Sequence, residues 1–337
     1  MHADYVPPDD QAGHSAQEIH DFKTEYHVCA ALRTLGHEVQ KLGVRDELQQ
    51  IRVAIDQWKP DIVFNLLEEF RGEAVYDLNV TAFLELLGIP YTGCGPRGLL
   101  LARDKALSKQ LMTYHRIRVP RFAVFAMGRT IRRPRKLEFP LIVKSLLEDS
   151  SMGISQASVV RDDDTFAERV RFIHERIATD AIVEEFIPGR ELYTAVMGNH
   201  QRLTALPVQE LVFEKKPPDA ELIATEKAKH DVAYQKRWGV DVTQARELPE
   251  GLEKRLREVG KRIYRVLGLA GYARVDFRLD DQLRPVFLEA NPNPDIAPSE
   301  EFAAAAGAAG LRYEELIQRI LVLGLNRRPH PGARPAE

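Results

Sequence analysis

The stretch YARVDFRLDDQLRPVFLEANPNP, residues 272–294, constrains the fold more than any other part of the chain. Two apolar runs flank a polar turn, and each run carries polar side chains at alternate positions, which is the period of a strand. Alternate residues of a strand share a face, so Arg274 points the same way as Asp276. On the second run Glu289 points the same way as Asn291. An antiparallel hairpin that pairs Asp276 with Glu289 also places the arginine opposite the asparagine and gathers all four groups.

Two facing carboxylates in such a hairpin repel each other unless a proton or a cation lies between them. Oxygen ligands at this charge density suit a magnesium ion that keeps some waters and shares substrate phosphates. A partly exposed hairpin with ordinary salt bridges is the alternative. The spacing of Asp276 and Glu289 alone does not separate the two readings.

The bulk composition is that of an ordinary soluble globular protein of two or three domains: 337 residues, 44% hydrophobic, 29% charged, net charge −3. Nothing in it indicates a nucleic acid or membrane partner. No apolar run reaches the ~18 residues of a membrane helix, and the start MHADYVPPDD lacks the apolar core of a signal peptide, so we expect a cytoplasmic protein. Cys29 and Cys94 are too few for a disulfide framework and are expected to be reduced and structural.

Helix and strand patterns alternate through residues 1–115, which predicts a parallel α/β domain. The helical patterns lie near 16–35, 46–57 and 74–87, and the strand patterns near 37–44, 61–67 and 89–93. A small α+β lobe is expected over 116–195, with strands at 139–146, 154–160 and 181–186 and a helix near 164–178. A C-terminal lobe over 196–325 would hold a long loop at 214–241, a strongly periodic helix near 251–268 and the hairpin. Residues 326–337 read as a disordered tail.

Four segments in order resemble the ATP-grasp ligases, and among them the D-alanine:D-alanine ligases, over about residues 15–323. They are LELLGIPYTGCGPRGLLLARDKALSKQL, FPLIVKSLLEDSSMGIS, AIVEEFIPGRELYTAVMGN and the hairpin. The resemblance implies an ATP-grasp fold of class α/β (α+β), with an N-terminal parallel α/β lobe and two α+β lobes that clasp ATP. It implies an ADP-forming ligase that joins a small-molecule carboxylate to an amine through an acyl phosphate. Walker A, GxGxxG and GxSxG motifs are absent.

The resemblance also implies roles for particular residues. Nucleotide binding falls to Lys105, Lys144, Ser151, Gly153, Glu184, Glu185, Phe186, Ile187 and Glu191. Catalytic roles fall to Arg274, Ser150 and Lys229, although the loop alignment could slip to Lys227. Asp276, Glu289 and Asn291 match the ligands of two Mg²⁺ ions, or of Mn²⁺ in their place. Lys109, by contrast, reads as a solvated helix lysine.

The positions that would fix the substrates depart from the family pattern. Gln17 stands where a glutamate that grips the first substrate's ammonium is expected, with Glu18 one place away. Glu300 occupies, by count, the position of a serine that binds the second substrate's carboxylate, so the amine substrate would be blocked at its carboxyl end, basic, or not an α-amino acid. Three readings stay open: D-alanine ligation, the same chemistry on another amino acid, peptide or amine, and a non-catalytic ATP-binding regulator. A homodimer is compatible with each.

Overall fold

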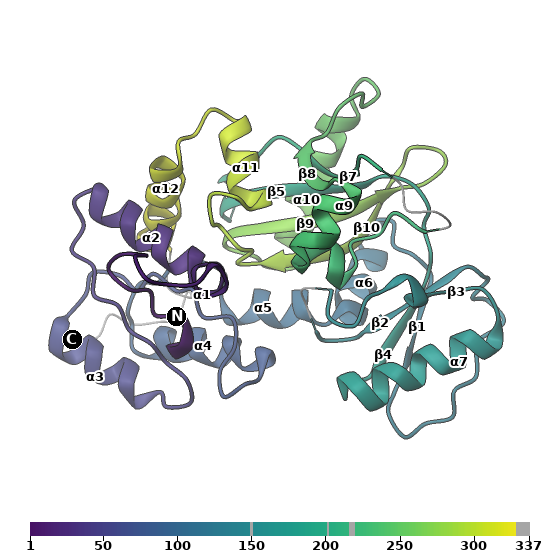
Figure 1. Cartoon of the computed structure of the whole chain (residues 1–337), viewed down its shortest axis with the longest axis horizontal. Helices are drawn as coiled ribbons and strands as arrows, with labels where there is room; N and C mark the ends of the chain where they lie inside the picture. Colours follow the sequence, from purple (N-terminus) through teal and green to yellow (C-terminus); the bar gives the residue numbers. More distant parts are fainter. Residues whose placement is uncertain (149–150, 201, 216–219, 328–337) are drawn as a thin grey trace.

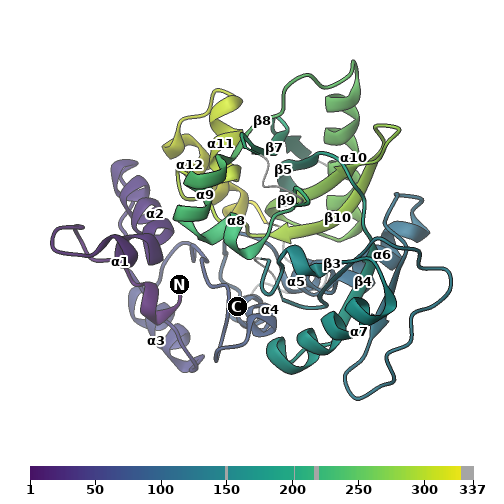
Figure 2. The ribbon, with the colours of Figure 1, turned by 45° about the vertical axis from the view of Figure 1, so that its right-hand side comes forward.

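The structure contains two antiparallel sheets, a larger one in the upper part of the molecule and a smaller one at its lower right, each with helices beside it (Figures 1 and 2). The structure is a computed structural model that describes residues 1–148, 151–200, 202–215 and 220–327. Within these ranges no helix is both long and apolar enough to cross a membrane. Cys29 and Cys94 are buried and free, as expected.

The smaller sheet has the strand order β1-β4-β2-β3. Its strands are β1 (Phe122–Phe125), β2 (Leu141–Ser145), β3 (Val159–Val160) and β4 (Ala181–Glu185). Val143 and Val183 point to one face and pack on Phe166 of α7 (Asp163–Phe172), which continues as a π-helix over Ile173–Ile177. Because side chains alternate, Lys144 and Glu184 lie on the opposite face.

The larger sheet has the order β10-β9-β5-β7-β8, with β6 beside β5. Its strands are β5 (Glu191–Asn199), β6 (Arg202–Ala205), β7 (Gln209–Phe213), β8 (Val240–Gln244), β9 (Gly271–Leu279) and β10 (Pro285–Pro292). On one face Val275 and Phe277 pack on α10 (Leu252–Val266). On the other, Tyr272 packs on α11 (Glu301–Ala308) and α12 (Tyr313–Leu325), next to α2 (Lys23–Thr34).

The register of the β9–β10 hairpin is the one that the sequence predicts. Asp276 lies opposite Glu289, and Arg274 lies opposite Asn291. A β-bulge between Phe287 and Glu289 makes this possible, because it lets Phe287 pair with Phe277 while Glu289 still faces Asp276. The bulge itself was not predicted.

The N-terminal region departs from expectation in its strands. Its helices are α1 (Ala16–Asp21), α2, α3 (Gln49–Trp58), α4 (Asp77–Leu86), α5 (Pro96–Arg103) and α6 (Lys105–Tyr114), with 3₁₀ turns at Ala3–Tyr5 and Ala74–Tyr76. Among the described residues, its parallel pairing is limited to isolated bridges, His2 with Val44 and Val63 with Tyr91. Val63 donates to the Pro90 carbonyl and accepts from the Thr92 N–H, which completes the bridge, and Pro90 has no N–H with which to extend the ladder in the other direction.

Two other expectations need correction. The stretch 214–241, expected to be a loop, contains α8 (Glu226–His230) and α9 (Val232–Trp238) and the start of β8, because Thr225 and Asp231 cap the two helices. The start of the expected disordered tail is ordered: Arg327 donates to the Gly93 carbonyl at 3.1 Å and lies over the Tyr91 ring. Residues 328–337 lie outside the described residues. Strand β5 crosses the expected boundary at 195, and the domain limits stay a prediction.

Candidate active site

A pocket opens between the polar faces of the two sheets. The smaller sheet contributes Lys144 and Glu184 to its wall, and the larger sheet contributes Asp276 and Glu289. The wall contains many of the residues that the sequence assigns to a site: Lys144, Ser151, Glu184, Glu185, Phe186, Ile187, Glu191, Lys229, Asp276 and Glu289. These residues come from strands, loops and α8, so the fold gathers segments that are far apart in the chain.

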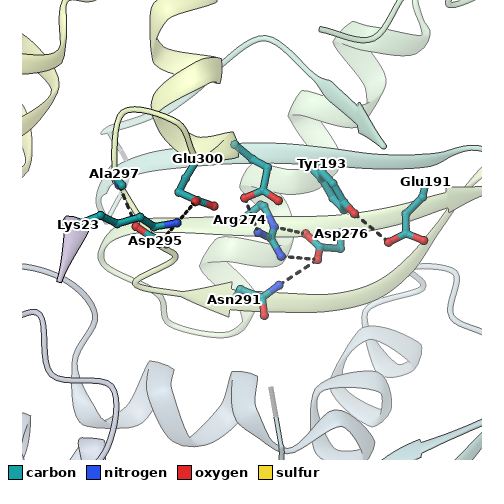
Figure 3. Close-up of polar contacts among 10 residues, drawn as sticks. Lys23, Glu191, Tyr193, Arg274, Asp276, Asn291, Asp295, Ala297 and Glu300 are labelled. Atoms are coloured by element: carbon teal, nitrogen blue, oxygen red, sulfur yellow. Dashed lines mark hydrogen bonds and ion pairs between the residues drawn. The ribbon is translucent and has the colours of Figure 1, made fainter. Parts of the chain in front are cut away.

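The carboxylate of Asp276 is the centre of a hydrogen-bond network on the larger sheet (Figure 3). Arg274 donates from Nε to Oδ1 at 2.8 Å and from Nη2 to Oδ2 at 3.0 Å, and its Nη1 lies 3.3 Å from Glu301. Asn291 donates its amide to Oδ2 at 3.0 Å. Arg274 and Asn291, both predicted to act around the phosphates, therefore both bind Asp276, although neither is part of the pocket wall.

The two acidic groups of the hairpin have pKa values shifted in opposite directions. Burial, together with the nearby Glu289, raises the pKa of Asp276 to about 6 despite its contact with Arg274. Burial would also raise the pKa of Glu289, but Lys105, Lys144 and other nearby lysines lower it to about 2. A cation between the two carboxylates would relieve the cost of ionising Asp276.

The donor set at this place fits a hard cation. Two carboxylates and one amide offer oxygen ligands, and no third His, Cys, Asp or Glu joins them among the described residues. A site with so few protein ligands suits Mg²⁺, which keeps several waters and takes oxygens from substrate phosphates.

Lys109 differs most from its predicted setting. Its side chain is fully buried, and its Nζ lies 2.9 Å from Glu184 Oε1 and donates to the Leu288 carbonyl at the β-bulge. Lys144 lies 3.3 Å from the other oxygen of Glu184. Burial would raise the pKa of Glu184, but the two lysines bring it below its ordinary value. The prediction of a solvated Lys109 is wrong, because α6 packs against β10.

The other end of the pocket is apolar. Ile142, Phe186 and Ile223 form a buried cluster there, and Ile187 is beside them in the wall. Arg278 lies at the edge of this apolar end and pairs with Glu191 at 2.8 Å. An apolar slot with polar groups at its edge is the usual character of a cofactor site.

Other predicted residues lie beside the pocket rather than in its wall. Lys105 Nζ donates to the Glu148 carbonyl at 2.6 Å, and the Gly153 N–H donates to Glu226 of α8 at 3.0 Å. Lys229 lines the pocket whereas Lys227 is exposed, which favours Lys229 over Lys227 as the lysine that acts on the phosphates. Ser150 lies outside the described residues.

Gln17 and Glu18, the residues predicted to bind the first substrate, make hydrogen bonds within their own helix. Glu18 completes a capping box with Ser15, and Gln17 donates to Asp21. Instead, Lys23 of α2 pairs with Glu300 and lies 3.8 Å from Asp295 (Figure 3). Sequence reasoning missed this pair, and also Arg278, although the alternation of Arg274, Asp276 and Arg278 along β9 was a usable signal.

Glu25, on the same helix, is a buried carboxyl that the sequence did not single out. Burial raises its pKa to about 7, with the N-terminal amino group opposing and Asp295 adding to the shift. The folded state then holds a proton between the ordinary pKa of 4.5 and about 7, so stability falls as pH rises through this window.

We therefore expect Glu25→Gln to unfold with less pH dependence than the wild type. Between pH 5 and pH 8 the variant should gain about 3 kcal/mol in free energy of unfolding relative to the wild type. Urea unfolding of both proteins at the two pH values measures this, with the exposed Glu47→Gln as control. An equal difference between variant and wild type at both pH values would contradict the assignment.

Comparison with known proteins places this geometry in a class. The crystal structure of D-alanine–D-alanine ligase from Bacillus anthracis complexed with ATP matches with a TM-score of 0.73 at 23% identity, covering 93% of this chain and 94% of that one. The two sheets therefore have the ATP-grasp fold.

Sequence comparisons identify the family. The family described as D-ala D-ala ligase C-terminus matches residues 111–322. The D-alanine–D-alanine ligase of Bordetella avium is 32% identical over 314 residues, covering 92% of this chain and 91% of the ligase. An uncharacterized protein of Sinorhizobium fredii is 34% identical over 302 residues, covering 87% and 85%. The chain belongs to the D-alanine–D-alanine ligase family, and it is an ATP-dependent, ADP-forming ligase that makes a carbon–nitrogen bond.

Proposed function

We propose that this chain activates a small carboxylic acid with ATP and magnesium and joins it to an amine. The observation that supports this most directly is the placing of Lys144 and Lys229 in one pocket with Asp276 and Glu289. Cations there suit the nucleotide's phosphates, and the carboxylates suit a metal ion that neutralises the same phosphates. A non-catalytic regulator is not favoured, because the matching relatives are ligases.

In this proposal the apolar end holds the adenine ring between Ile142, Phe186, Ile187 and Ile223, and strand-edge groups at Glu184 and Glu185 read its edge. Glu191 binds the sugar hydroxyls. Lys105, Lys144 and Lys229 neutralise the phosphates, and the loop that contains Ser151 and Gly153 covers them. Ser151 has a φ of 60°, so the backbone already turns there.

Asp276, Glu289 and Asn291 would hold the magnesium. When bound, the metal supplies positive charge that positions the phosphates and stabilises the charge that develops during phosphoryl transfer. Two hydrogen bonds to Asp276 fix the orientation of the Arg274 guanidinium, so the other N–H groups of this side chain point in a fixed direction. A fixed guanidinium can stabilise the transferring phosphoryl group and the oxyanion without reorganising.

The reaction then proceeds in two steps. The substrate carboxylate attacks the γ-phosphorus and releases ADP, and the amine attacks the resulting acyl phosphate and releases phosphate. Positioning and charge neutralisation perform most of the catalysis, so no covalent enzyme intermediate is required.

D-Alanine is the first substrate to try, because the relatives are D-alanine–D-alanine ligases. The Lys23–Glu300 pair modifies this proposal. Glu300 is a half-buried carboxylate beside Asp295, and Lys23 is already bound to it. A free carboxylate of the amine substrate would meet two acidic groups and a lysine that is already paired.

We expect Glu300→Ser to raise kcat/KM for free D-alanine as the amine substrate by about tenfold, since Lys23 could then bind the substrate's carboxylate. The comparison substrate is D-alanine amide, for which the substitution should bring no gain. ADP release at increasing D-alanine measures the first value, and ADP release at increasing D-alanine amide with D-alanine held constant measures the second. Unchanged use of free D-alanine would defeat the idea that Glu300 selects the amine.

Product analysis tests the proposed function as a whole. Purified protein is incubated with ATP, Mg²⁺ and a panel of D- and L-amino acids, dipeptides and amines. ADP and phosphate that depend on one acid and amine pair would support the acyl-phosphate ligase and name its substrates. AMP with pyrophosphate would overturn the mechanism, and ATP binding without turnover would point to the regulator.

The finer features remain proposals of the same kind. We propose a cytoplasmic location, where ATP and amino acids are available, and domain limits near 115, 195 and 325. Whether the chain forms a homodimer is measured by sedimentation of the full chain.

A further inference from the structure

Arg278 of β9 is held at the pocket by a carboxylate, two backbone carbonyls and an aromatic ring. Its side chain is 4% exposed and lies in the pocket wall, on the face of β9 that also carries Arg274 and Asp276. Nη2 donates to Glu191 Oε2 at 2.8 Å, with Nε at 3.3 Å from the same oxygen. Nη1 donates to the Ile187 carbonyl at 3.0 Å, and Nη2 also donates to the Leu222 carbonyl.

These contacts leave the guanidinium little freedom. Its plane lies over the Phe186 ring, with the central carbon 5.2 Å from the ring centroid. An arginine fixed by carbonyls, a carboxylate and an aromatic ring is a rigid donor fork rather than a mobile charge.

Glu191 is held from its other side as well. The Tyr193 hydroxyl donates to Oε1 at 3.0 Å, so each carboxylate oxygen has a protein partner that sets its direction (Figure 3). A carboxylate can accept about four hydrogen bonds, and with three protein donors in place Glu191 keeps about one acceptor site, on Oε1, for a ligand. A preoriented acceptor binds a ligand's hydroxyls with less entropy lost than a mobile one.

We propose that Arg278 is a positioning residue that, together with Tyr193, aims the Glu191 carboxylate at a sugar hydroxyl of a ribonucleotide. Discrimination between ribose and deoxyribose then depends on a residue that need not touch the sugar. The inference rests on the proposed function, in which Glu191 faces the sugar.

The test compares ATP with 2′,3′-dideoxy-ATP, which lacks both hydroxyls, in calorimetric titrations with Mg²⁺ and the full chain. Arg278→Met should weaken ATP binding by about tenfold or more, because a buried carboxylate loses its charged partner and its direction. The same variant should bind dideoxy-ATP as the wild type does. Tyr193→Phe keeps the ring, removes the other hydrogen bond to Glu191, and should show a smaller effect with the same selectivity.

The matched control is Arg190→Met. Arg190 also forms a two-pronged pair, with both contacts to Glu210 at 2.6 Å, but it lies outside the pocket wall. The Arg190→Met variant should bind ATP and dideoxy-ATP as tightly as the wild type does. Arg278→Lys keeps the charge without the fork and should recover only part of the ATP affinity.

Each outcome decides between positioning and other roles. Equal loss of ATP and dideoxy-ATP affinity in Arg278→Met would overturn the inference and assign Arg278 to the base pocket or to folding. If that variant fails to fold, Tyr193→Phe still decides, since equal loss there also overturns it. A wild type that binds dideoxy-ATP as tightly as ATP overturns the inference alone. A wild type that binds neither nucleotide overturns the proposed function too.

Discussion

Asp276→Asn and Glu289→Gln are each expected to lower the ATP-dependent ligation rate by about a thousandfold or more. Asp276 and Glu289 lie opposite each other on the hairpin, and each change removes the negative charge of one of these two oxygen ligands. The donor set would then be one carboxylate and two amides, which holds the metal more weakly, and the phosphates would lose the cation that neutralises them. Side-chain size hardly changes, so the loss reports charge and not packing.

The fold should survive both substitutions for reasons that differ. Asp276 is costly to ionise, because burial and Glu289 raise its pKa, so an amide in its place removes that cost. Arg274 loses its ion pair with Asp276 in this variant but keeps its contact with Glu301. Glu289 is surrounded by lysines that lower its pKa. Glu289→Gln leaves those lysines facing each other, and we expect it to be the less stable variant of the two.

Steady-state ADP release at increasing Mg²⁺, together with thermal unfolding, measures both effects. The control is Asp280→Asn in the turn of the same hairpin, whose carboxylate pairs with Arg284 at 2.6 Å outside the pocket. That variant should keep the wild-type rate. A wild-type rate in either Asp276→Asn or Glu289→Gln would defeat the magnesium assignment.

Local patterns in the sequence predicted what strand periodicity can encode. Alternation along 272–294 gave the hairpin, its register and the grouping of Arg274 with Asp276, because a pleated strand converts sequence spacing directly into faces. The bulge at Leu288 was not predicted, although an extra residue reverses the phase of the alternation. In a regular strand Phe287 and Glu289 would share a face, whereas here Phe287 pairs with Phe277 and Glu289 with Asp276.

Contacts between distant segments could not be predicted in the same way. Lys23 and Glu300 are 277 positions apart. Lys109 of α6 contacts Glu184 of the smaller sheet and the Leu288 carbonyl of the larger sheet. A charged residue in a helix reads as solvent-facing unless the packing of that helix is known. The prediction of strands in the N-terminal region was wrong for a related reason. An apolar run forms a strand only if a neighbouring segment offers its backbone N–H and C=O groups for pairing, and the sequence does not show whether one does.

Lys109→Met is the prediction with the largest expected effect on stability. Lys109 and Glu184 have fully buried side chains 2.9 Å apart, and Lys109 also bonds the Leu288 carbonyl. Removing the ammonium leaves Glu184 with Lys144 alone and leaves the carbonyl of the bulge without this donor. Breaking a buried ion pair from one side costs about 3–5 kcal/mol in free energy of unfolding, and we expect a loss in that range.

The comparison with Lys261→Met isolates the effect of burial. Lys261 lies on α10 and pairs with Glu258 at 2.8 Å, nearly the same distance, but that pair faces solvent. Its removal should hardly change the unfolding free energy, because solvent screens the charges and Glu258 stays hydrated. Urea unfolding of both variants gives the contrast directly.

The double variant Lys109→Met with Glu184→Gln then distinguishes an ion pair from simple packing. If the cost of Lys109→Met comes from a carboxylate left half-paired, the second substitution should cost less in the variant than in the wild type, with a coupling of about 1–3 kcal/mol. Strict additivity would mean that Lys109 acts through its aliphatic stem and its bond to Leu288. In that case the lysine would tie α6 to β10 but would have no part in holding Glu184 at the pocket.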